Sequence, residues 1–119
     1  MNRNKLLRVL IDLGIRRVDA EIYIYLAVNG PKIGRELSKE LNMNKQQLYR
    51  SLKKLQKKGL VKASLEHPAL FTAITIEDSL NSFKETRLEE ALFIKENKDE
   101  LLSRWKTIIK QNQLKKDLE

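Results

Sequence analysis

The chain has 119 residues, of which 24 are Lys or Arg and 16 are Asp or Glu, so its formal net charge is +8 and its pI is about 9.8. This length accommodates one domain, or one domain and an extended element, and excludes a large two-domain enzyme. The absence of cysteine excludes disulfides and thiolate metal sites, and no stretch approaches the ~18 apolar residues of a membrane span. We expect a soluble cytoplasmic protein with an acidic partner.

The positive charge is concentrated in the first half of the chain. Residues 1–59 carry a net charge of +9, whereas the remaining residues carry −1. The last third is rich in charges of both signs, which is typical of a solvated helix. The two parts of the chain are therefore expected to have different functions.

Two helices are predicted before residue 30. Apolar side chains recur at helical spacing over Asn4–Leu13, and Gly14 ends that helix. Asp19 is the predicted N-cap of the next helix, an apolar segment that stops at Asn29–Gly30.

A pair of helices joined by a short turn is predicted next. Pro31 is expected to open the first of them, because proline is tolerated in the first turn, and Asn42 to end it in the left-handed conformation. Asn44 and Gln47 have the spacing of a capping box for the second helix, which ends at Gly59. Helices of about eleven and fifteen residues joined by about three have the spacing of a helix-turn-helix.

The pattern changes to β-strands after Gly59 and then returns to a helix. Two short segments rich in Val, Phe and Thr, LVKASLE and ALFTAIT, flank His67–Pro68 and predict a β-hairpin. From Glu77 the helical spacing continues to about Lys116 without glycine or proline. We expect a mostly α fold with a small β-hairpin, divided into a domain over residues 1–76 and a long helix over residues 77–119.

The helix over residues 45–58 has two contrasting sides. On a helical wheel, Leu48, Leu52 and Leu55 share the side that faces a core. The opposite side carries Gln46, Arg50, Lys53 and Lys57, flanked by Gln47 and Lys54.

This pattern suits a helix in the major groove of DNA, where Lys and Arg meet phosphates and Arg or Gln pairs with base edges. The alternative is a basic surface that is only solvated. The acid-free run from Asn42 to Ala63 and the preceding helix and turn favour DNA.

Further candidates lie beside this helix. Lys32 and Arg35 are near the amino end of the preceding helix, where backbone N–H groups could hold a phosphate, although surface exposure explains them equally well. Tyr49 either reaches a phosphate or packs at the domain edge. Basic residues before residue 18, Arg16 among them, could extend the positive field, although an unpaired basic tail is common in proteins. The candidate DNA contacts are Lys32, Arg35, Asn44, Lys45, Gln46, Gln47, Tyr49, Arg50, Lys53, Lys54 and Lys57.

The order of these parts resembles a winged helix-turn-helix, and residues 6–81 resemble the DNA-binding domain of the TrmB-like archaeal transcriptional regulators. The resemblance is carried by LGI before AEIYIYLAVNGP, by the block LYRSLKKLQKKGLV, and by PALFTAIT before an acidic helix start. It implies a dimeric regulator that binds duplex DNA through the helix from Lys45 to Lys58.

Two departures from that family pattern are visible. Wings of the family often carry basic residues near the turn, whereas residues 66–70 here read EHPAL. Longer members continue into a sugar-sensing domain, whereas this chain ends after one more helix, so we expect a short form without that domain, and the resemblance does not imply a sugar effector. The effector, if one exists, is unknown.

The long carboxyl-terminal helix is expected to pair with a second copy of the chain. From Ile94 its apolar positions follow the steps of four and three residues of a heptad seam, with two polar interruptions. At about 60 Å it is longer than the preceding domain is wide, so it cannot bury its stripe there alone. The alternative is that part of it folds back on its own chain. The predicted dimerisation residues are Leu80, Phe83, Leu88, Ala91, Ile94, Leu101, Trp105 and Ile108.

Other functions have less support. The only histidine, His67, is interpreted as a turn residue, and the sequence has no Gly-rich phosphate loop or nucleophile elbow. We expect no catalysis, metal or cofactor. We expect a specific homodimeric regulator on a nearly palindromic DNA site, located in the cytoplasm and associated with the nucleoid. The rivals are a winged-helix module for protein contact in a transcription or chromosome-associated assembly and a nonspecific architectural DNA coat. The basic face argues against the first, whereas the second needs the same phosphate contacts.

Overall fold

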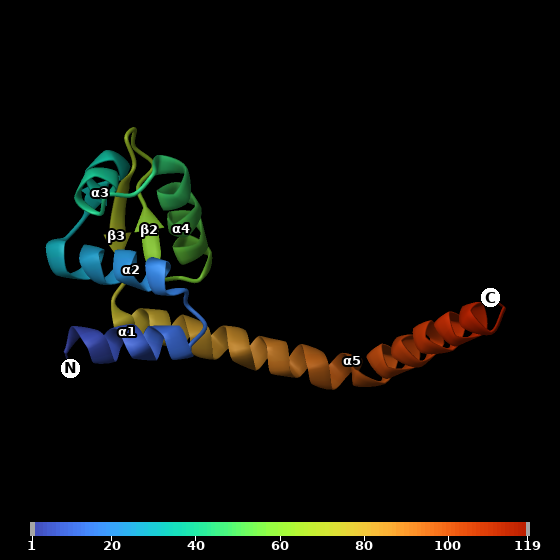
Figure 1. Cartoon of the computed structure of the whole chain (residues 1–119). Coiled ribbons are helices and arrows are strands. Elements are labelled where there is room, and N and C mark those ends of the chain that lie inside the picture. Colours follow the sequence, from blue (N-terminus) through green and yellow to red (C-terminus); the bar gives the residue numbers. More distant parts are fainter. Residues whose placement is uncertain (1, 119) are drawn as a thin grey trace. The chain divides into compact units, whose positions relative to one another are not determined.

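The computed structural model describes residues 2–118, which fold as two compact units that divide between Phe83 and Lys84. Figure 1 shows the elements in chain order. They are α1 (Arg3–Asp12), α2 (Arg17–Asn29), β1 (Lys32–Ile33), α3 (Gly34–Glu40), α4 (Lys45–Lys57), β2 (Val61–Ala63), β3 (Leu70–Ala73) and α5 (Ile76–Leu118). The first unit extends beyond the expected boundary at residue 76, because it includes the beginning of α5.

The first two helices begin with different caps. The Asn2 side chain accepts a hydrogen bond from the backbone N–H of Lys5 at 2.9 Å and so caps α1. The prediction that Asp19 caps α2 is wrong, because that helix begins at Arg17. The buried Asp19 carboxylate lies within the first turn, where the helix dipole favours an anion. It accepts hydrogen bonds from the guanidinium of Arg16 at 3.2 and 3.3 Å.

The predicted helix start at Pro31 is also wrong. Lys32 and Ile33 form β1, which pairs antiparallel with Phe71 and Leu70 of β3, and α3 begins only at Gly34. Extended backbone is favoured here because β3 provides hydrogen-bonding partners that are distant in the sequence. The predicted hairpin of β2 and β3 is present, and β1 extends it to a sheet in the order β1-β3-β2.

The turn between α3 and α4 largely follows the prediction. Asn42 has a φ of 50°, the left-handed conformation expected of it. The Ser38 hydroxyl donates to the carbonyl of Met43 at 2.6 Å and closes the turn. Asn44 caps α4, but its side chain accepts from the N–H of Gln46 at 2.7 Å rather than from Gln47.

The core of the first unit lies between the helices and the sheet. Its buried side chains come from α1, α2, α3, α4, β2 and β3. They include Leu10, Ile22, Leu26, Leu37, Leu48, Leu52, Leu55, Val61 and Phe71. None of the helices in residues 2–118 combines the length and apolar character needed to cross a membrane.

The two parts of α5 have different surroundings. Within the first unit, Ser79 is buried and Phe83 packs against the core. In the second unit, residues 84–118 are almost all exposed, apolar ones included. An ion pair between Arg104 and Glu100 at 3.0 Å stabilises one turn of that segment.

Candidate nucleic-acid interface

Helix α4 packs on α2, α3 and β2 through one apolar stripe. Leu48, Leu52 and Leu55 are buried as predicted, and Ser51 is buried with them. After the C-cap residue, Gly59 has a φ of 78°, which lets the chain leave the helix toward β2 without a side-chain clash. The other side of α4 is therefore left to solvent.

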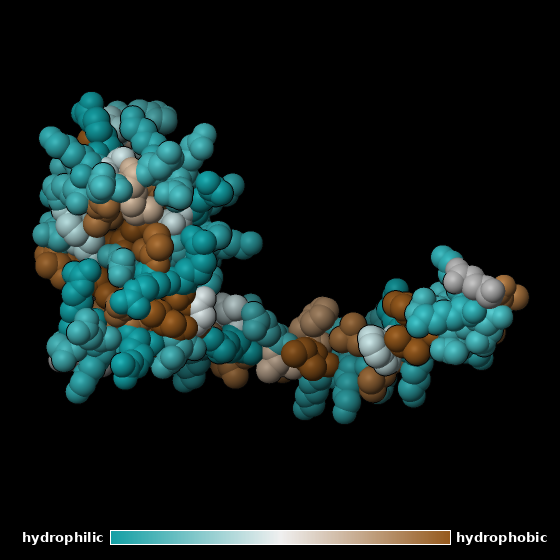
Figure 2. All heavy atoms as spheres, in the orientation of Figure 1, coloured by the Kyte–Doolittle hydropathy of each residue, from teal (hydrophilic) through white to brown (hydrophobic). Residues whose placement is uncertain are grey.

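The outer side of α4 carries all the side chains that the sequence assigned to it. Figure 2 shows hydrophilic residues over this part of the molecule. The exposed candidates are Asn44, Lys45, Gln46, Gln47, Tyr49, Arg50, Lys53, Lys54 and Lys57. Four of them, Gln46, Tyr49, Arg50 and Lys53, line one shallow hollow, so they lie close enough to contact one ligand.

The cations of α4 have no acidic partner in the described part of the chain. Within residues 2–118, no carboxylate lies within 4.0 Å of the side-chain nitrogens of its five cations, which are Lys45, Arg50, Lys53, Lys54 and Lys57. The exposed face is thus both basic and uncompensated, which is the electrostatic character of a surface that binds phosphates.

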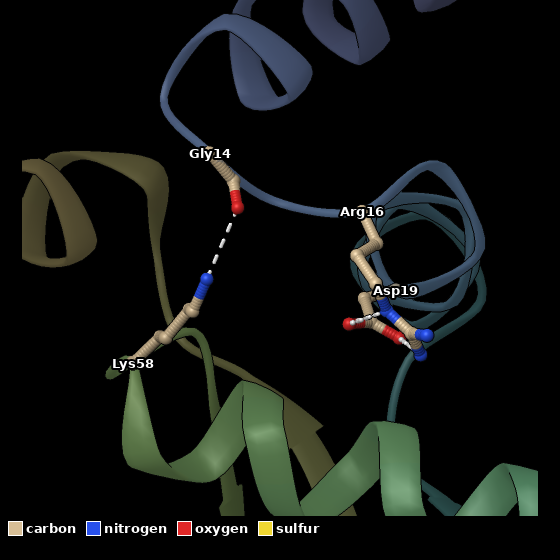
Figure 3. A network of polar contacts seen from close by, with 4 residues as sticks. All are labelled: Gly14, Arg16, Asp19 and Lys58. Carbon is tan, nitrogen blue, oxygen red and sulfur yellow. Dashed lines mark hydrogen bonds and ion pairs between the residues drawn. The ribbon is translucent and has the colours of Figure 1, made fainter. Parts of the chain in front are cut away.

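Arg16 joins this surface, although the sequence placed it only among the basic residues of the amino terminus. It precedes α2, and Figure 3 shows its guanidinium facing the Asp19 carboxylate. The hydrogen bond from the Arg16 guanidinium to the Asp19 carboxylate, together with the negative charge of Asp19, raises the pKa of Arg16. Arg16 lines one pocket together with Gln47, Arg50 and Lys54. The Arg-x-x-Asp spacing at a helix start was the signal available in the sequence.

The loop before Arg16 is tied to the end of α4. Lys58, the C-cap residue of α4, donates a hydrogen bond from its ammonium to the carbonyl of Gly14 at 3.1 Å (Figure 3). Lys58 therefore has a structural partner within the chain, unlike the cations on the outer side of α4. This contact connects the α1–α2 loop with the carboxyl end of α4.

Tyr49 packs at the domain edge and still leaves half of its surface open. Its ring meets that of Phe71 edge to face, with centroids 6.1 Å apart and an interplanar angle of 68°. Its hydroxyl lies so close to Gly34 that a β-carbon at that position would collide with it. Tyr49 is nevertheless 49% exposed. It therefore links α4 to β3 and to the start of α3 while remaining part of the outer face.

Lys32 and Arg35 have different positions. Lys32 belongs to β1 and is half-buried, whereas Arg35 is exposed in the first turn of α3. The carboxylate of Glu36 accepts a hydrogen bond from the N–H of Ile33 at 3.2 Å, so one amide at this helix start already has an acidic partner. Arg35 shares a hollow with Lys45 and Tyr49 of α4, and Pro68 lines it from the hairpin.

The tip of the β-hairpin is apolar and acidic. Leu65 is fully exposed, and Glu66, His67 and Pro68 are exposed beside it. The turn is closed by two hydrogen bonds: the N–H of Ser64 donates to the carbonyl of Leu70, and the N–H of Leu70 to the Ser64 hydroxyl. No group of three or more metal-ligating side chains occurs in the described part of the chain.

The residues assigned to dimerisation lie in both units. In the first unit, Phe83 packs against the core, whereas Leu80, three residues earlier, is exposed. In the second unit the other six are exposed, with Trp105 at 62%. These six are Leu88, Ala91, Ile94, Leu101, Trp105 and Ile108.

These elements define a winged helix-turn-helix domain. Helices α3 and α4 form the helix-turn-helix, and the β2–β3 hairpin is the wing. The expected fold class is confirmed, with one more strand than predicted.

The chain belongs to the TrmB family. The family model, described as "Sugar-specific transcriptional regulator TrmB", matches residues 10–77. The family and fold are those of transcriptional regulators, and the resemblance noted in the sequence is confirmed. No curated protein matches the chain.

Solved structures share the fold. TrmBL2, an archaeal chromatin protein whose structure shows a novel mode of DNA binding, has a TM-score of 0.66 and 21% identity over 86% of this chain and 42% of its own. The transcriptional regulator Tm0710 from Thermotoga maritima has a TM-score of 0.54 and 22% identity, over 88% of this chain and 83% of its own. A possible transcriptional regulator from Methanosarcina mazei Go1 has a TM-score of 0.54 and 18% identity, over 77% of this chain and 83% of its own. This chain thus spans less than half of TrmBL2.

Proposed function

We propose that this protein is a transcriptional regulator that binds double-stranded DNA sequence-specifically as a homodimer, with α4 in the major groove. One observation carries the proposal. The exposed face of α4 presents amide and basic side chains that have no acidic partner within the described chain. DNA phosphates supply the missing negative charge, and the family to which the chain belongs regulates transcription. Such a protein would act in the cytoplasm, on the nucleoid.

The outer face of α4 offers separate groups for reading bases and for holding the backbone. Gln46 and Arg50 lie one turn apart in a shared hollow, and their side chains suit adenine and guanine respectively. Lysines such as Lys53 and Lys57 suit phosphates, which fix the position of the protein without reading the sequence. The wing tip has no cation from Ser64 to Leu70, so we assign it no phosphate contact.

The second unit supports the proposal of a homodimer. Its apolar side chains, among them Ile94, Trp105 and Ile108, are exposed along a helix that would extend about 50 Å over residues 84–118. Figure 2 shows hydrophobic and hydrophilic residues intermixed along this part of α5. Pairing two copies along the heptad seam would remove these side chains from water at about 25 cal/mol per Å².

A twofold dimer predicts the form of the DNA site. Two copies of α4 related by a twofold axis would enter successive major grooves about 34–36 Å apart, so the site would be nearly palindromic. The test is selection of bound duplexes from a random pool by the full chain. We expect an enriched inverted repeat with half-sites about one turn apart; a pool that stays random after repeated rounds would remove sequence specificity from the proposal.

A nonspecific architectural role is the second candidate. It is favoured by the fold similarity to TrmBL2, which is a chromatin protein. A coat needs the phosphate contacts of α4 but no base contacts. The two candidates are distinguished by a competition assay with labelled selected DNA. Unrelated unlabelled duplex at equal concentration should displace much of the labelled DNA from a nonspecific coat, whereas a specific regulator should keep it in the presence of a large excess of unrelated duplex.

A further inference from the structure

A pocket of about 400 Å³ lies beside the DNA-binding face of α4. The start of α2, the α3–α4 turn and the middle of α4 line it together. This volume is within the range of small-molecule sites, roughly 300–1,000 Å³. All the lining residues belong to the first compact unit.

The pocket has an apolar part. Ile22 of α2 is buried, and Leu41 and Met43 of the α3–α4 turn are half-buried and pack against the core. Val18 also lines the pocket but is 46% exposed and is not part of the core. An apolar ligand body seated here would cover the parts of Val18, Leu41 and Met43 that now face water.

The polar part of the pocket is positive. Arg50 and Lys54 lie one helical turn apart and have no acidic partner in residues 2–118. Glu21 is the acidic side chain that lines the pocket, and it pairs with Arg17 at 3.5 Å, while Arg16, which also lines the pocket, pairs with Asp19 at 3.2 Å. Two cations are therefore left for a ligand, and the Gln47 amide and the Ser51 hydroxyl line the same space.

We propose that this pocket binds a small organic anion, a carboxylate on a compact apolar body. The Arg50 guanidinium presents the planar fork that holds a carboxylate through two parallel hydrogen bonds, and Lys54 adds a second charge. The apolar body lies against Ile22, Leu41 and Met43.

Such a ligand would compete with DNA. Gln47, Arg50 and Lys54 line the pocket and also belong to the face proposed to contact DNA, so one set of side chains cannot serve both. By linkage, the factor by which the anion weakens DNA binding equals the factor by which DNA weakens anion binding. This coupling rests on the proposed function, whereas binding of the anion to the free protein does not.

The free protein offers a direct probe of the pocket. The chain has only two methionines, Met1 and Met43, so methionine methyl NMR gives two signals, and substitution of Met43 by Leu assigns the one that reports the pocket. The probes are benzoate, its uncharged analogue benzamide, and acetate, which lacks the apolar body. We expect benzoate to shift the Met43 signal saturably, and both other compounds to bind about tenfold more weakly or worse.

A matched pair of variants separates the pocket from the rest of the surface. Val18→Trp fills the pocket opening from an exposed position, and Val28→Trp places the same side chain at the other end of α2, where Val28 is 73% exposed. We expect Val18→Trp to abolish the benzoate shift and Val28→Trp to leave it intact. An unchanged Met43 signal with benzoate in the original chain, or equal effects of benzoate and benzamide, would overturn the proposal.

DNA titration then tests the coupling. With the selected duplex we expect benzoate to raise the apparent Kd for DNA in the Val28→Trp variant and not in Val18→Trp. If DNA shifts the Met43 signal and benzoate does not, the pocket is part of the DNA interface only, and the anion site is refuted. Failure of DNA binding with a normal benzoate titration would instead refute the proposed function and leave the pocket assignment standing.

Discussion

The hydroxyl of Ser79 donates a hydrogen bond to the carbonyl of Gly59 at 3.0 Å, and this contact joins the beginning of α5 to the second residue after α4. Ser79 is completely buried. A second hydrogen bond holds Ile74, five residues before Ser79: the hydroxyl of Tyr23 in α2 donates to the carbonyl of Ile74 at 2.6 Å. The connections on both sides of the wing are thus fixed by side chains that bind backbone carbonyls.

Replacing Ser79 by Ala should destabilise the first unit. The substitution removes the donor to the Gly59 carbonyl, and an acceptor left without a partner inside the protein costs about 1–3 kcal/mol of unfolding free energy. The measurement is urea unfolding at neutral pH. Ser82→Ala, at an exposed position one turn later, is the control and should change stability by less than about 0.5 kcal/mol.

Stability should fall in strongly alkaline solution because of Tyr23. Burial raises the pKa of Tyr23 above its ordinary value of 10.0, and a hydrogen bond with Ser79 opposes this shift. The neutral Tyr23 side chain therefore contributes to the free energy of unfolding. This contribution is fully present below pH 10, where the tyrosine of the unfolded chain is neutral, and it is lost as pH rises through the higher pKa of the folded state. Urea unfolding at a series of pH values should show this decline. Tyr23→Phe should be less stable at neutral pH, and its curve should be flatter; an identical slope in both proteins would contradict the assignment.

Gly34→Ala should displace the Tyr49 side chain. A β-carbon at Gly34 would collide with the hydroxyl end of Tyr49, and moving this half-exposed ring loses its edge contact with Phe71, worth about 0.5–1.5 kcal/mol. Thermal and urea unfolding of the two single variants and of Gly34→Ala with Tyr49→Ala form a double-mutant cycle. We expect the second substitution to recover most of the loss that Gly34→Ala causes; strictly additive losses would show that the two residues do not interact.

Arg50 and Lys53 should differ in their effect on DNA binding. If Arg50 reads a base, Arg50→Ala should cost about 1–3 kcal/mol on the selected site and less on unrelated DNA. Lys53→Ala, the neighbouring control on the same face, should weaken both to the same degree and reduce the slope of log affinity against log salt by about one. Fluorescence anisotropy from 50 to 200 mM salt measures both quantities. Equal losses of Arg50→Ala on both DNAs would make Arg50 a phosphate contact.

The seam of α5 should determine the oligomeric state. Ile108→Asp places a charge among exposed apolar side chains that we expect to pair between copies, and a buried unpaired charge strongly disfavours association. Ser103→Asp adds the same charge on the other side of the helix and is the matched control. Light scattering at micromolar concentration should show a monomer for the first variant and a dimer for the second. A monomer for the original chain would remove dimerisation from the proposal.

Local signals in the sequence predicted the elements that depend on local chemistry. The Asn44 cap, the left-handed Asn42 and the leucine stripe of α4 all follow from neighbours a few residues apart. The same holds for the long helix, whose start differs by one residue from the prediction.

Two features that the sequence analysis missed, the strand β1 and the position of Arg16, depend on distant parts of the chain. Lys32 and Ile33 become a strand because β3 lies beside them, and no property of Pro31 reveals a partner almost forty residues away. Arg16 joins the pocket because the fold brings the start of α2 against α4. The exposed side of α4 was predictable because its residues recur at helical spacing, whereas the pocket required three elements to meet.

The unpaired cations of α4 have a consequence for the protein without DNA. Arg50 precedes Lys53 and Lys54 by three and four residues, and Lys57 follows them by four and three. Like charges at these spacings destabilise a helix by about 0.2–0.5 kcal/mol per pair. Dissolved salt screens this repulsion and should therefore strengthen the free fold at the same concentrations at which it loosens the complex. If α4 binds DNA as proposed, the phosphates act as its counterions, and binding relieves the repulsion among these side chains.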